Sequence, residues 1–491
     1  MINTTGLLTR QISHVQKLVD SLHLNGFGVD LSDTGCGKTY CASAVAREMN
    51  VPTFIVCPKI VIPEWNKVLA FYGIRAIDIR NYASLVRGNK NSVYTEWVKE
   101  DHPFLKDAYG NPRKWDRLRF SSKIPSNALI IFDECHQCKA LDSSNSELLM
   151  TAREQGFKTL LVSASAATSP IEMKGFGYVT RLHNHYDHNE FKRMFAKAYG
   201  ATWKKGRTGG LVFDPTHPDS QTAMLKLHTK LFDTTACASR LTTHDMKEHF
   251  SDNHVMAEAF DMAGNTDKIN KVYDLMEYEL DQLDEHTNGY SDHIFSIMMR
   301  ARRHSELLKV PTYVESIDEA IRSNKSVAIF LNFNESIDAC IKRLETKYRT
   351  PKMLRQGTAL TIGSIRGGQT DKSRQQIIED FQSDDCRIIV CNIAAGGVGV
   401  SLHDLNGNHA RESLISPNYS AIQLKQALGR IHRVDGKTEC VQKIIFAAGT
   451  IEERACEKVQ ARLNNLALLN DGDMMEGIQF YGQSVENWDS K

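Results

Sequence analysis

The sequence of 491 residues has almost no net charge, because 60 lysines and arginines are matched by 59 aspartates and glutamates, leaving +1. This balance excludes a histone-like polycation but leaves room for a local basic groove. No apolar run approaches the roughly 18 residues that a membrane-spanning helix needs. Residues 1–8 lack a charged segment followed by an apolar one, so we expect no secretory signal and a cytoplasmic or nuclear location. A short-period repeat is also missing, which argues against a solenoid.

A second cysteine pair is missing as well. The eleven cysteines are an odd number and are scattered through apolar stretches, as expected for reduced core thiols in a cytosol-like compartment. Cys135 and Cys138 form one C-x-x-C pair, and no second pair stands at the spacing that a zinc site of about four ligands requires. We therefore expect ordinary thiols at this pair.

Short apolar runs that alternate with helical patterns dominate much of the chain. Such alternation predicts an α/β fold with parallel sheets covered on both faces. The predicted strands of the first part are residues 26–31, 53–57, 128–132 and 159–162. Those of the later part are residues 326–331, 361–363, 387–391, 413–415 and 441–446.

The change of pattern between these two parts predicts the domain organisation. The length suggests about three domains, and longer helical patterns separate the two strand-rich parts. A capping-box pattern at Thr450–Glu453 predicts the start of a C-terminal helix. We predict a first lobe over residues 1–185, a helical insertion over 186–310, a second lobe over 311–449, and a helix with a polar tail over 450–491.

The segment Ser32–Thr39 reads S-D-T-G-C-G-K-T and lies between a predicted strand and a predicted helix. This is the context of a phosphate-binding P-loop. Gly35 and Gly37 would let backbone N–H groups approach phosphate oxygens at a helix N-terminus. Lys38 would reach the β- and γ-phosphates and Thr39 would hold Mg²⁺. The alternative is a glycine-rich turn that happens to precede Lys-Thr.

Two carboxylates, Asp133 and Glu134, come directly after the predicted strand 128–132. An ionised aspartate at the end of a strand can hold Mg²⁺ beside a P-loop. The next carboxylate can orient and deprotonate an attacking water. The alternative, a strand that leaves the sheet into a polar loop, is weakened by the P-loop upstream.

Near the other end, Gln426–Arg433 reads Q-A-L-G-R-I-H-R. If this segment is helical, Arg430 and Arg433 share one face. Arginine is always charged and offers a planar fork to phosphate. Such a pair can stabilise charge on a transferring γ-phosphoryl group. A basic surface helix is the alternative.

Together these motifs resemble those of superfamily-two helicases and translocases, which include the DEAD/DEAH-box proteins, and especially the Swi/Snf-like branch. The similarity covers roughly residues 7–460, and Gln426–Arg433 is a very close match to the family's motif VI. Other segments that resemble family motifs are Leu7 with Gln11, Val56–Pro58 with Trp65, Asn81–Leu85, Ser163–Ser165, Val327–Phe333 and Ala394–Leu402.

The resemblance implies two RecA-like lobes with ATP and Mg²⁺ between them. The nucleotide-binding residues that it implies are Gln11, Gly35, Cys36, Gly37, Lys38, Thr39, Asp133 and Gly399, with Thr39 and Asp133 on Mg²⁺. The implied catalytic residues are Lys38, Glu134, Gln426, Arg430 and Arg433. The implied contacts to the nucleic-acid backbone, which carry no base information, are Pro58, Lys59, Asn81, Tyr82, Ser84, Gly396, Gly397 and Ser401.

The expected activity is that of a monomeric DNA translocase, which couples ATP hydrolysis to the remodelling of branched or forked duplexes. The lack of a recognisable accessory domain motivates this choice, which depends on analogy between folds. Two alternatives stay open. One is a strand-separating DNA or RNA helicase, and the other is a nucleotide-gated clamp with slow turnover.

Three charged regions leave their roles open. Residues 87–125 mix lysines and arginines with aromatics, which suits either single-strand contacts or a small core of the insertion's own. A basic group opens the predicted helical insertion and is either a track contact or a solvated face. Its members are Lys192, Arg193, Lys197, Lys204, Lys205 and Arg207. The acidic stretch 267–285 would repel phosphate, so we expect it to face away from nucleic acid.

Overall fold

The structure is a computed structural model, and it comprises two compact units. It describes residues 2–87, 92–106, 109–204, 210–262, 264–283, 290–396, 400–418, 420–471 and 479–481. The first unit contains Met1–Trp203, Leu211–Met246 and Asn465–Met474. The second unit contains Lys204–Gly210, Lys247–Asn464 and Met475–Lys491.

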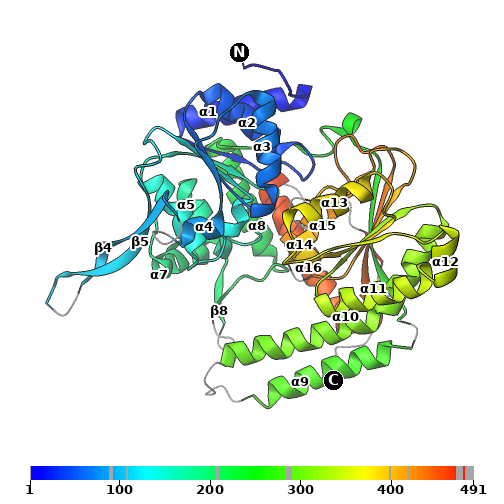
Figure 1. The fold of residues 1–491 in the computed structure, drawn as a ribbon. Coiled ribbons are helices and arrows are strands. Elements are labelled where there is room, and N and C mark those ends of the chain that lie inside the picture. The colour runs from blue at the N-terminus through cyan, green and yellow to red at the C-terminus, as the bar shows by residue number, and fades with distance from the viewer. Residues whose placement is uncertain are drawn as a thin grey trace. The chain divides into compact units, whose positions relative to one another are not determined.

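The first unit is built on a parallel sheet with the strand order β10-β1-β7-β6-β2-β3. Its central strands are continuous apolar runs, as parallel strands buried on both faces require. The strands are β1 (Phe27–Asp30), β2 (Thr53–Cys57), β3 (Asp78–Asn81), β6 (Leu129–Asp133), β7 (Lys158–Val162) and β10 (Ala238–Ser239). The principal helices of this unit are α1 (Thr9–Leu24), α2 (Lys38–Met49), α3 (Ile62–Tyr72), α4 (Tyr82–Val86), α5 (Ser144–Glu154), α6 (Lys174–Val179) and α8 (Pro218–Thr229) (Figure 1).

The second unit has its own parallel sheet, in the order β13-β14-β12-β15-β16-β11-β17. Strand β12 is fully buried and lies near the middle. The strands are β11 (Asn253–Phe260), β12 (Ser326–Leu331), β13 (Ile362–Ile365), β14 (Ile388–Asn392), β15 (Arg411–Ile415), β16 (Cys440–Ala447) and β17 (Gln479–Tyr481). Its helices include α10 (Tyr290–Arg322), α11 (Asn334–Tyr348), α12 (Pro351–Gln356), α13 (Asp371–Gln382), α14 (Ile393–Gly396) and α15 (Ala421–Leu428).

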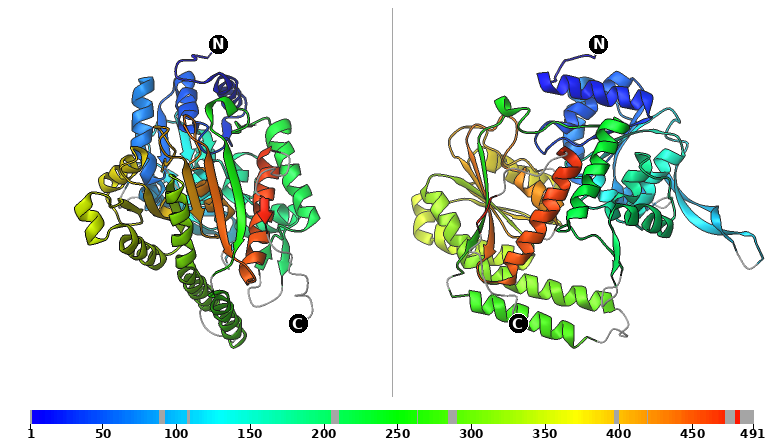
Figure 2. Two further views of the ribbon diagram at one scale, coloured as in Figure 1. Left: turned by 90° about the vertical axis from the view of Figure 1, so that its right-hand side faces the viewer. Right: turned by 180° about the vertical axis from the view of Figure 1, so that it is seen from behind.

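The two parallel sheets confirm the predicted fold class, and all nine predicted strands are present within about three residues of their expected ends. The predicted helical insertion, residues 186–310, differs. Its strand β10 pairs with β1 in the first sheet, and its strand β11 pairs with β16 in the second. The stretch is therefore divided between the two units. Its helix α8 belongs to the first unit, whereas α9 (Thr266–Asp281) and the start of α10 belong to the second and run side by side (Figures 1 and 2).

The region 87–125 contains an antiparallel hairpin of β4 (Thr95–Lys106) and β5 (Pro112–Phe120), which extends from the first unit as an arm (Figure 1). Most of its described aromatic side chains pack rather than stand free. Tyr94 lies 5.0 Å from the ring of Phe54, and the Trp97 indole donates to Val86 O over 3.0 Å. Tyr109 is 90% exposed. The structure thus favours the alternative in which the aromatic side chains of residues 87–125 form a small core, rather than a surface on which bases of a single strand would stack.

Helix α16 (Ile451–Asp471) confirms the predicted C-terminal helix. Near its start Glu452 is buried, and it accepts from Lys309 Nζ and Ser305 Oγ over 2.8 Å each. These partners hold the pKa of Glu452 below its usual value although burial opposes them. Near its end, Leu468 and Leu469 belong to the core of the first unit.

All eleven cysteines are free and buried. Burial raises the pKa of ten of these thiols, for example to about 12 at Cys36 and about 11 at Cys440. Among the described residues, no group of three or more histidine, cysteine or acidic side chains is placed to hold a metal ion. The helices of the same residues include none with the length and hydropathy of a membrane span.

The first unit should lose stability in mild acid because of His183. Burial lowers the pKa of this imidazole to about 4, and its Nδ1 accepts from His185 N over 3.2 Å, which requires the neutral ring. The folded-state pKa lies below the unfolded value of about 6.5, so the unfolded chain binds more protons between these two pH values. We expect the free energy of unfolding to fall by about 2–3 kcal/mol as pH drops through that window.

Urea unfolding at a series of pH values would measure this loss. His183→Gln should flatten the pH dependence of the free energy of unfolding, because it removes the imidazole whose neutral form the fold requires. Equal slopes for His183→Gln and the parent chain would contradict the assignment.

Candidate nucleotide site

The predicted P-loop lies between β1 and α2, at the carboxyl end of a central strand. Gly35 and Gly37 have φ angles of 90° and 80°, in the left-handed region that glycine tolerates best. A Cβ on Gly37 would lie 2.6 Å from Nε2 of Gln11, so a larger residue would also clash. Helix α2 begins at Lys38 without a side-chain cap, which leaves its first N–H groups for an anion.

Two predicted nucleotide residues contact the loop directly. Gln11 donates from Nε2 to Cys36 O over 2.9 Å, and its Oε1 accepts from Leu8 N over 2.9 Å. Lys38 lies within the curve of the loop, where its Nζ donates to the carbonyls of Ser32 and Asp33 over 3.0 Å each. The structure therefore places Gln11 against the loop that carries Lys38.

A cluster of buried polar side chains lies beneath the P-loop, at the ends of strands β1 and β10. Asp30, fully buried at the end of β1, accepts from Ser32 N over 2.9 Å and lies 3.2 Å from His14 Nε2. His14 Nδ1 lies 2.8 Å from Ser239 Oγ on the neighbouring strand β10. The His14 ring, with Lys38 and the Ser32 hydrogen bond, holds the pKa of Asp30 below its usual value although burial opposes them. The sequence showed no motif for this cluster.

The carboxylate Asp133 is the last residue of β6, two strands from β1 in the same sheet. Its Oδ2 accepts from the Trp65 indole over 2.8 Å, and its Oδ1 accepts from Glu134 N over 2.9 Å. Burial, and next the charge of Glu134, raise its pKa to about 7, while Trp65 and the Lys38 ammonium act in the opposite direction. Because all strands are parallel, the P-loop and Asp133 share one edge of the sheet.

Glu134 follows in an uncommon backbone conformation. Its φ of 52° is left-handed, which a residue with a Cβ adopts only when its surroundings hold it there. Its Oε2 lies 3.2 Å from Nδ1 of His136, and that nitrogen lies 3.1 Å from Ser163 Oγ. Two predicted motifs, around residues 133–136 and 163–165, are thus joined by His136.

The second unit brings together the predicted residues of its two motifs. Arg430 donates from Nε to Gln426 O over 2.7 Å and from Nη1 to Val400 O over 3.3 Å. Arg433 donates from Nη2 to the same Val400 O over 3.1 Å. Ser401 is described next to Val400 and Gly396 ends α14, whereas Gly397 and Gly399 lie outside the described residues.

The expectation that both arginines share a helical face needs correction. Helix α15 ends at Leu428, with Gly429 as its C-cap, so Arg430 and Arg433 lie in the irregular segment that follows. A shared carbonyl acceptor, Val400 O, keeps the two guanidinium groups together instead of helical spacing.

Comparison with known proteins identifies the family. Residues 311–435 match the helicase conserved C-terminal domain. A putative ATP-dependent RNA helicase of Acanthamoeba polyphaga mimivirus is 33% identical over 494 residues, which cover 96% of this chain and 85% of that protein. The chain belongs to the family of ATP-dependent helicases. As a member, this helicase is a nucleic-acid-dependent ATPase.

Two further matches are more distant. The helicase is 26% identical over 143 residues to the RAD54-like DNA repair and recombination protein of Drosophila mojavensis, of which the match covers 16%. It also aligns with the SWI2/SNF2 ATPase core of Sulfolobus solfataricus in complex with double-stranded DNA. That alignment covers 96% of this chain and 94% of the archaeal one at 16% identity, with a TM-score of 0.35.

The residues that the resemblance assigns to nucleic acid follow two neighbouring strands of the helicase's first sheet. Pro58 and Lys59 come directly after β2, where Lys59 begins a short 3-10 helix. Asn81 ends β3 and caps α4, accepting from Ser84 N over 3.0 Å. Tyr82 differs from the expectation of a surface contact, because it is only 3% exposed and its hydroxyl donates to Asp133 O over 2.8 Å.

Of the basic group at 192–207, Lys205 and Arg207 lie outside the described residues. The described part begins with the short helical segment Phe191–Ala196, whose Phe191 and Phe195 are buried. Lys192 and Arg193 stand between these two anchors.

Proposed function

We propose that this helicase is an ATP- and Mg²⁺-driven DNA translocase that remodels branched or forked duplexes. The observation that carries the motor is that the loop ending at Lys38 follows β1 and that Asp133 ends β6, so both lie at the carboxyl edge of one parallel sheet. A triphosphate on the P-loop would lie beside the carboxylates that its hydrolysis needs.

Thr39 and Asp133 would hold Mg²⁺. Hydroxyl and carboxylate oxygens are the ligands that this ion prefers, with phosphate and water completing its shell. The buried Asp133 carboxyl fits this role, because a divalent cation would offset the burial and the Glu134 charge that disfavour its anion. When bound, the ion would neutralise charge on the phosphates.

The chain's own residues would divide the reaction as follows. Lys38 binds phosphate, Glu134 orients the attacking water and takes its proton, and Arg430 and Arg433 stabilise the charge that develops on the γ-phosphoryl group. Gln426, whose carbonyl binds Arg430, positions that arginine. Release of the phosphate would remove the ligand that favours a closed arrangement of the motor.

The nucleic-acid contacts would be independent of base sequence. Pro58, Lys59, Asn81 and Ser84 follow adjacent strands and offer backbone groups, a hydroxyl and a cation to phosphates. Ser401 and the glycines near it would do the same in the second unit. We propose a monomer that works in the cytoplasm or nucleus, where the free thiols stay reduced.

The test is ATPase activity over a panel of single-stranded, duplex, forked and four-way DNA, with RNA of the same lengths. Stimulation by branched DNA, with displacement of a third strand and no unwinding of the duplex, is the expected result. If no nucleic acid changed either the rate or the affinity for ATP, the coupled motor would be excluded. Fork unwinding without third-strand displacement would exclude translocation alone.

A strand-separating RNA helicase is the second candidate. It is favoured by the mimivirus relative, which is named as an RNA helicase and matches over 96% of this chain. Stimulation by RNA but not by DNA in the same panel would decide for it.

Removal of the Trp65 indole N–H should weaken the magnesium site. Trp65→Phe keeps an aromatic ring but takes away the donor to Asp133, and hydrogen bonds to charged groups contribute about 1.5–3 kcal/mol. We expect the Mg²⁺ concentration for half-maximal ATPase activity to rise about tenfold. Trp97→Phe is the matched control, because its indole donates to Val86 O instead. An equal shift in both variants would contradict the role of Trp65.

A further inference from the structure

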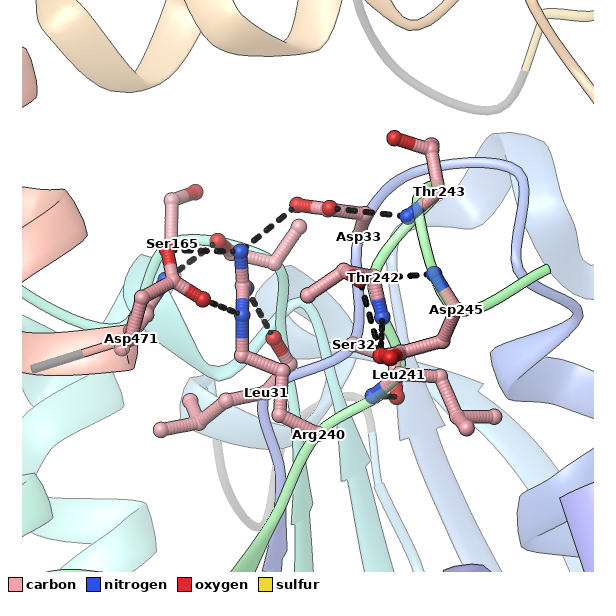
Figure 3. Close-up of polar contacts among 12 residues, drawn as sticks. Leu31, Ser32, Asp33, Ser165, Arg240, Leu241, Thr242, Thr243, Asp245 and Asp471 are labelled. Carbon is pink, nitrogen blue, oxygen red and sulfur yellow. Dashed lines mark hydrogen bonds and ion pairs between the residues drawn. The ribbon is translucent and has the colours of Figure 1, made fainter. Parts of the chain in front are cut away.

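Arg240 makes a dense set of contacts at the entrance of the P-loop (Figure 3). Its Nη1 donates to Leu31 O over 2.6 Å, and its Nη2 donates to Asp33 Oδ1 over 3.1 Å. The other side of the guanidinium meets Asp471, whose Oδ2 accepts from Nη2 over 3.0 Å and whose Oδ1 pairs with Nε. One side chain thus joins a P-loop residue to the end of α16.

Because the Arg240 guanidinium is buried, it needs hydrogen-bond acceptors and opposite charges around it. The Arg240 side chain is only 8% exposed, and a buried cation is costly unless it is paired and hydrogen-bonded. Asp33 and Asp471 raise its pKa although burial opposes them. The planar guanidinium can serve two carboxylates and a carbonyl at once, which the ammonium of a lysine cannot do with the same geometry.

The backbone around Arg240 also follows the loop. Arg240 comes directly after β10, and the pairing with β1 continues beyond the strand: Asp33 N donates to Leu241 O over 2.9 Å. In return Leu241 N donates to Ser32 Oγ over 3.0 Å. Asp33 is the central residue, because its carbonyl accepts from Lys38 and its side chain accepts from Arg240. A displacement of Arg240 would therefore move Asp33, and Asp33 would in turn move the Lys38 ammonium.

Asp471 is held in place independently of the loop. It belongs to the first unit by its contacts, and its neighbour Asn470 donates from Nδ2 to Ala164 O over 3.1 Å. An acidic residue at the last position of a helix is unfavourable, because the helix dipole is negative there. The Arg240 guanidinium compensates the negative charge of Asp471. The presence of an aspartate at this position is therefore explained by its ion pair with Arg240 and not by helix stability.

From these contacts we infer that Arg240 is a positioning residue of the nucleotide site, and that Asp471 makes the end of α16 a part of ATP binding. The inference rests on the proposed P-loop function. Without the guanidinium, Asp33 and Asp471 would each lose a cationic partner beside the phosphates. Loss of Asp471 alone would leave Arg240 on Asp33 and Leu31 with fewer constraints.

Binding of a non-hydrolysable ATP analogue with Mg²⁺, together with steady-state ATPase kinetics, tests the inference. We expect Arg240→Ala to raise the Kd of the analogue and the KM for ATP about tenfold or more, with kcat within about threefold. Asp471→Ala should raise both about three- to tenfold, and Asp471→Glu should recover part of the loss. Asp245→Ala is the comparison variant, and a smaller loss is expected there. Its carboxylate accepts from Thr242 N and Oγ1, one residue before the Thr243 N that donates to Asp33 Oδ2 over 3.3 Å.

The double variant separates positioning from general damage. Asp471→Ala in the Arg240→Ala chain removes a carboxylate whose bond to Arg240 is already gone, so the double variant should bind the analogue no more weakly than Arg240→Ala alone. Additive losses, equal damage by Asp245→Ala, or unchanged affinity in Asp471→Ala would each overturn the inference. If Arg240→Ala does not fold, the Asp471 variants decide. If the parent chain itself fails to bind the analogue, the proposed function fails instead.

Discussion

Glu134→Gln should bind ATP and yet hydrolyse it about 10²- to 10⁴-fold more slowly than the parent chain. The amide has the shape of the carboxylate but cannot take a proton from the attacking water. Its backbone is already held in the left-handed conformation, directly after Asp133, so the substitution leaves the magnesium carboxylate in place.

Single-turnover hydrolysis and analogue binding, measured side by side, would check this expectation. Glu172→Gln is a suitable control, because Glu172 is a glutamate of the same unit whose partners are Lys139 and Thr168 rather than the nucleotide residues. That variant should lower thermal stability and leave kcat unchanged. Near-normal turnover in Glu134→Gln would remove Glu134 from the role of base.

Arg430→Ala should lower kcat about 10³-fold or more, the size of effect seen when an arginine finger is removed. ATP affinity should change much less, because the guanidinium acts most strongly when charge moves on the γ-phosphoryl group. The thermal midpoint should also fall, since Arg430 bonds to Gln426 O and Val400 O within its own unit.

The split between kcat and affinity distinguishes catalysis from support of the fold. Arg366→Ala serves as the comparison, because Arg366 lies in the same unit and pairs with Asp338 at the surface. A loss of affinity as large as the loss of kcat would show that Arg430 mainly supports its own lobe.

The sequence was sufficient where local pattern and chemistry coincide. The P-loop and Asp133 were found because continuous apolar strands lead into them. By contrast β3 reads D-I-R-N and β10 has two residues, so neither has a strand pattern of its own. Both strands form because long-range parallel pairing supplies what local propensity lacks.

Contacts between distant residues account for the remaining differences. Trp65 and Asp133 are 68 positions apart, and Arg240 and Asp471 are 231 apart, so no window of sequence shows either pair. Helix α15 ends at Leu428, with Gly429 as its C-cap, so Arg430 lies outside the helix, and the spacing of the two arginines alone did not indicate this. Tyr82 carries an aromatic ring and a hydroxyl, and only the fold shows that both point into the core.

The burial of every cysteine has a practical consequence for studying the motor. Thiol-reactive dyes attack the thiolate, and buried thiols with raised pKa values supply very little of it at neutral pH. One engineered surface cysteine on each unit would therefore accept fluorophores against a silent background. Energy transfer between them would then report how the spacing of the units follows each step of the ATP cycle.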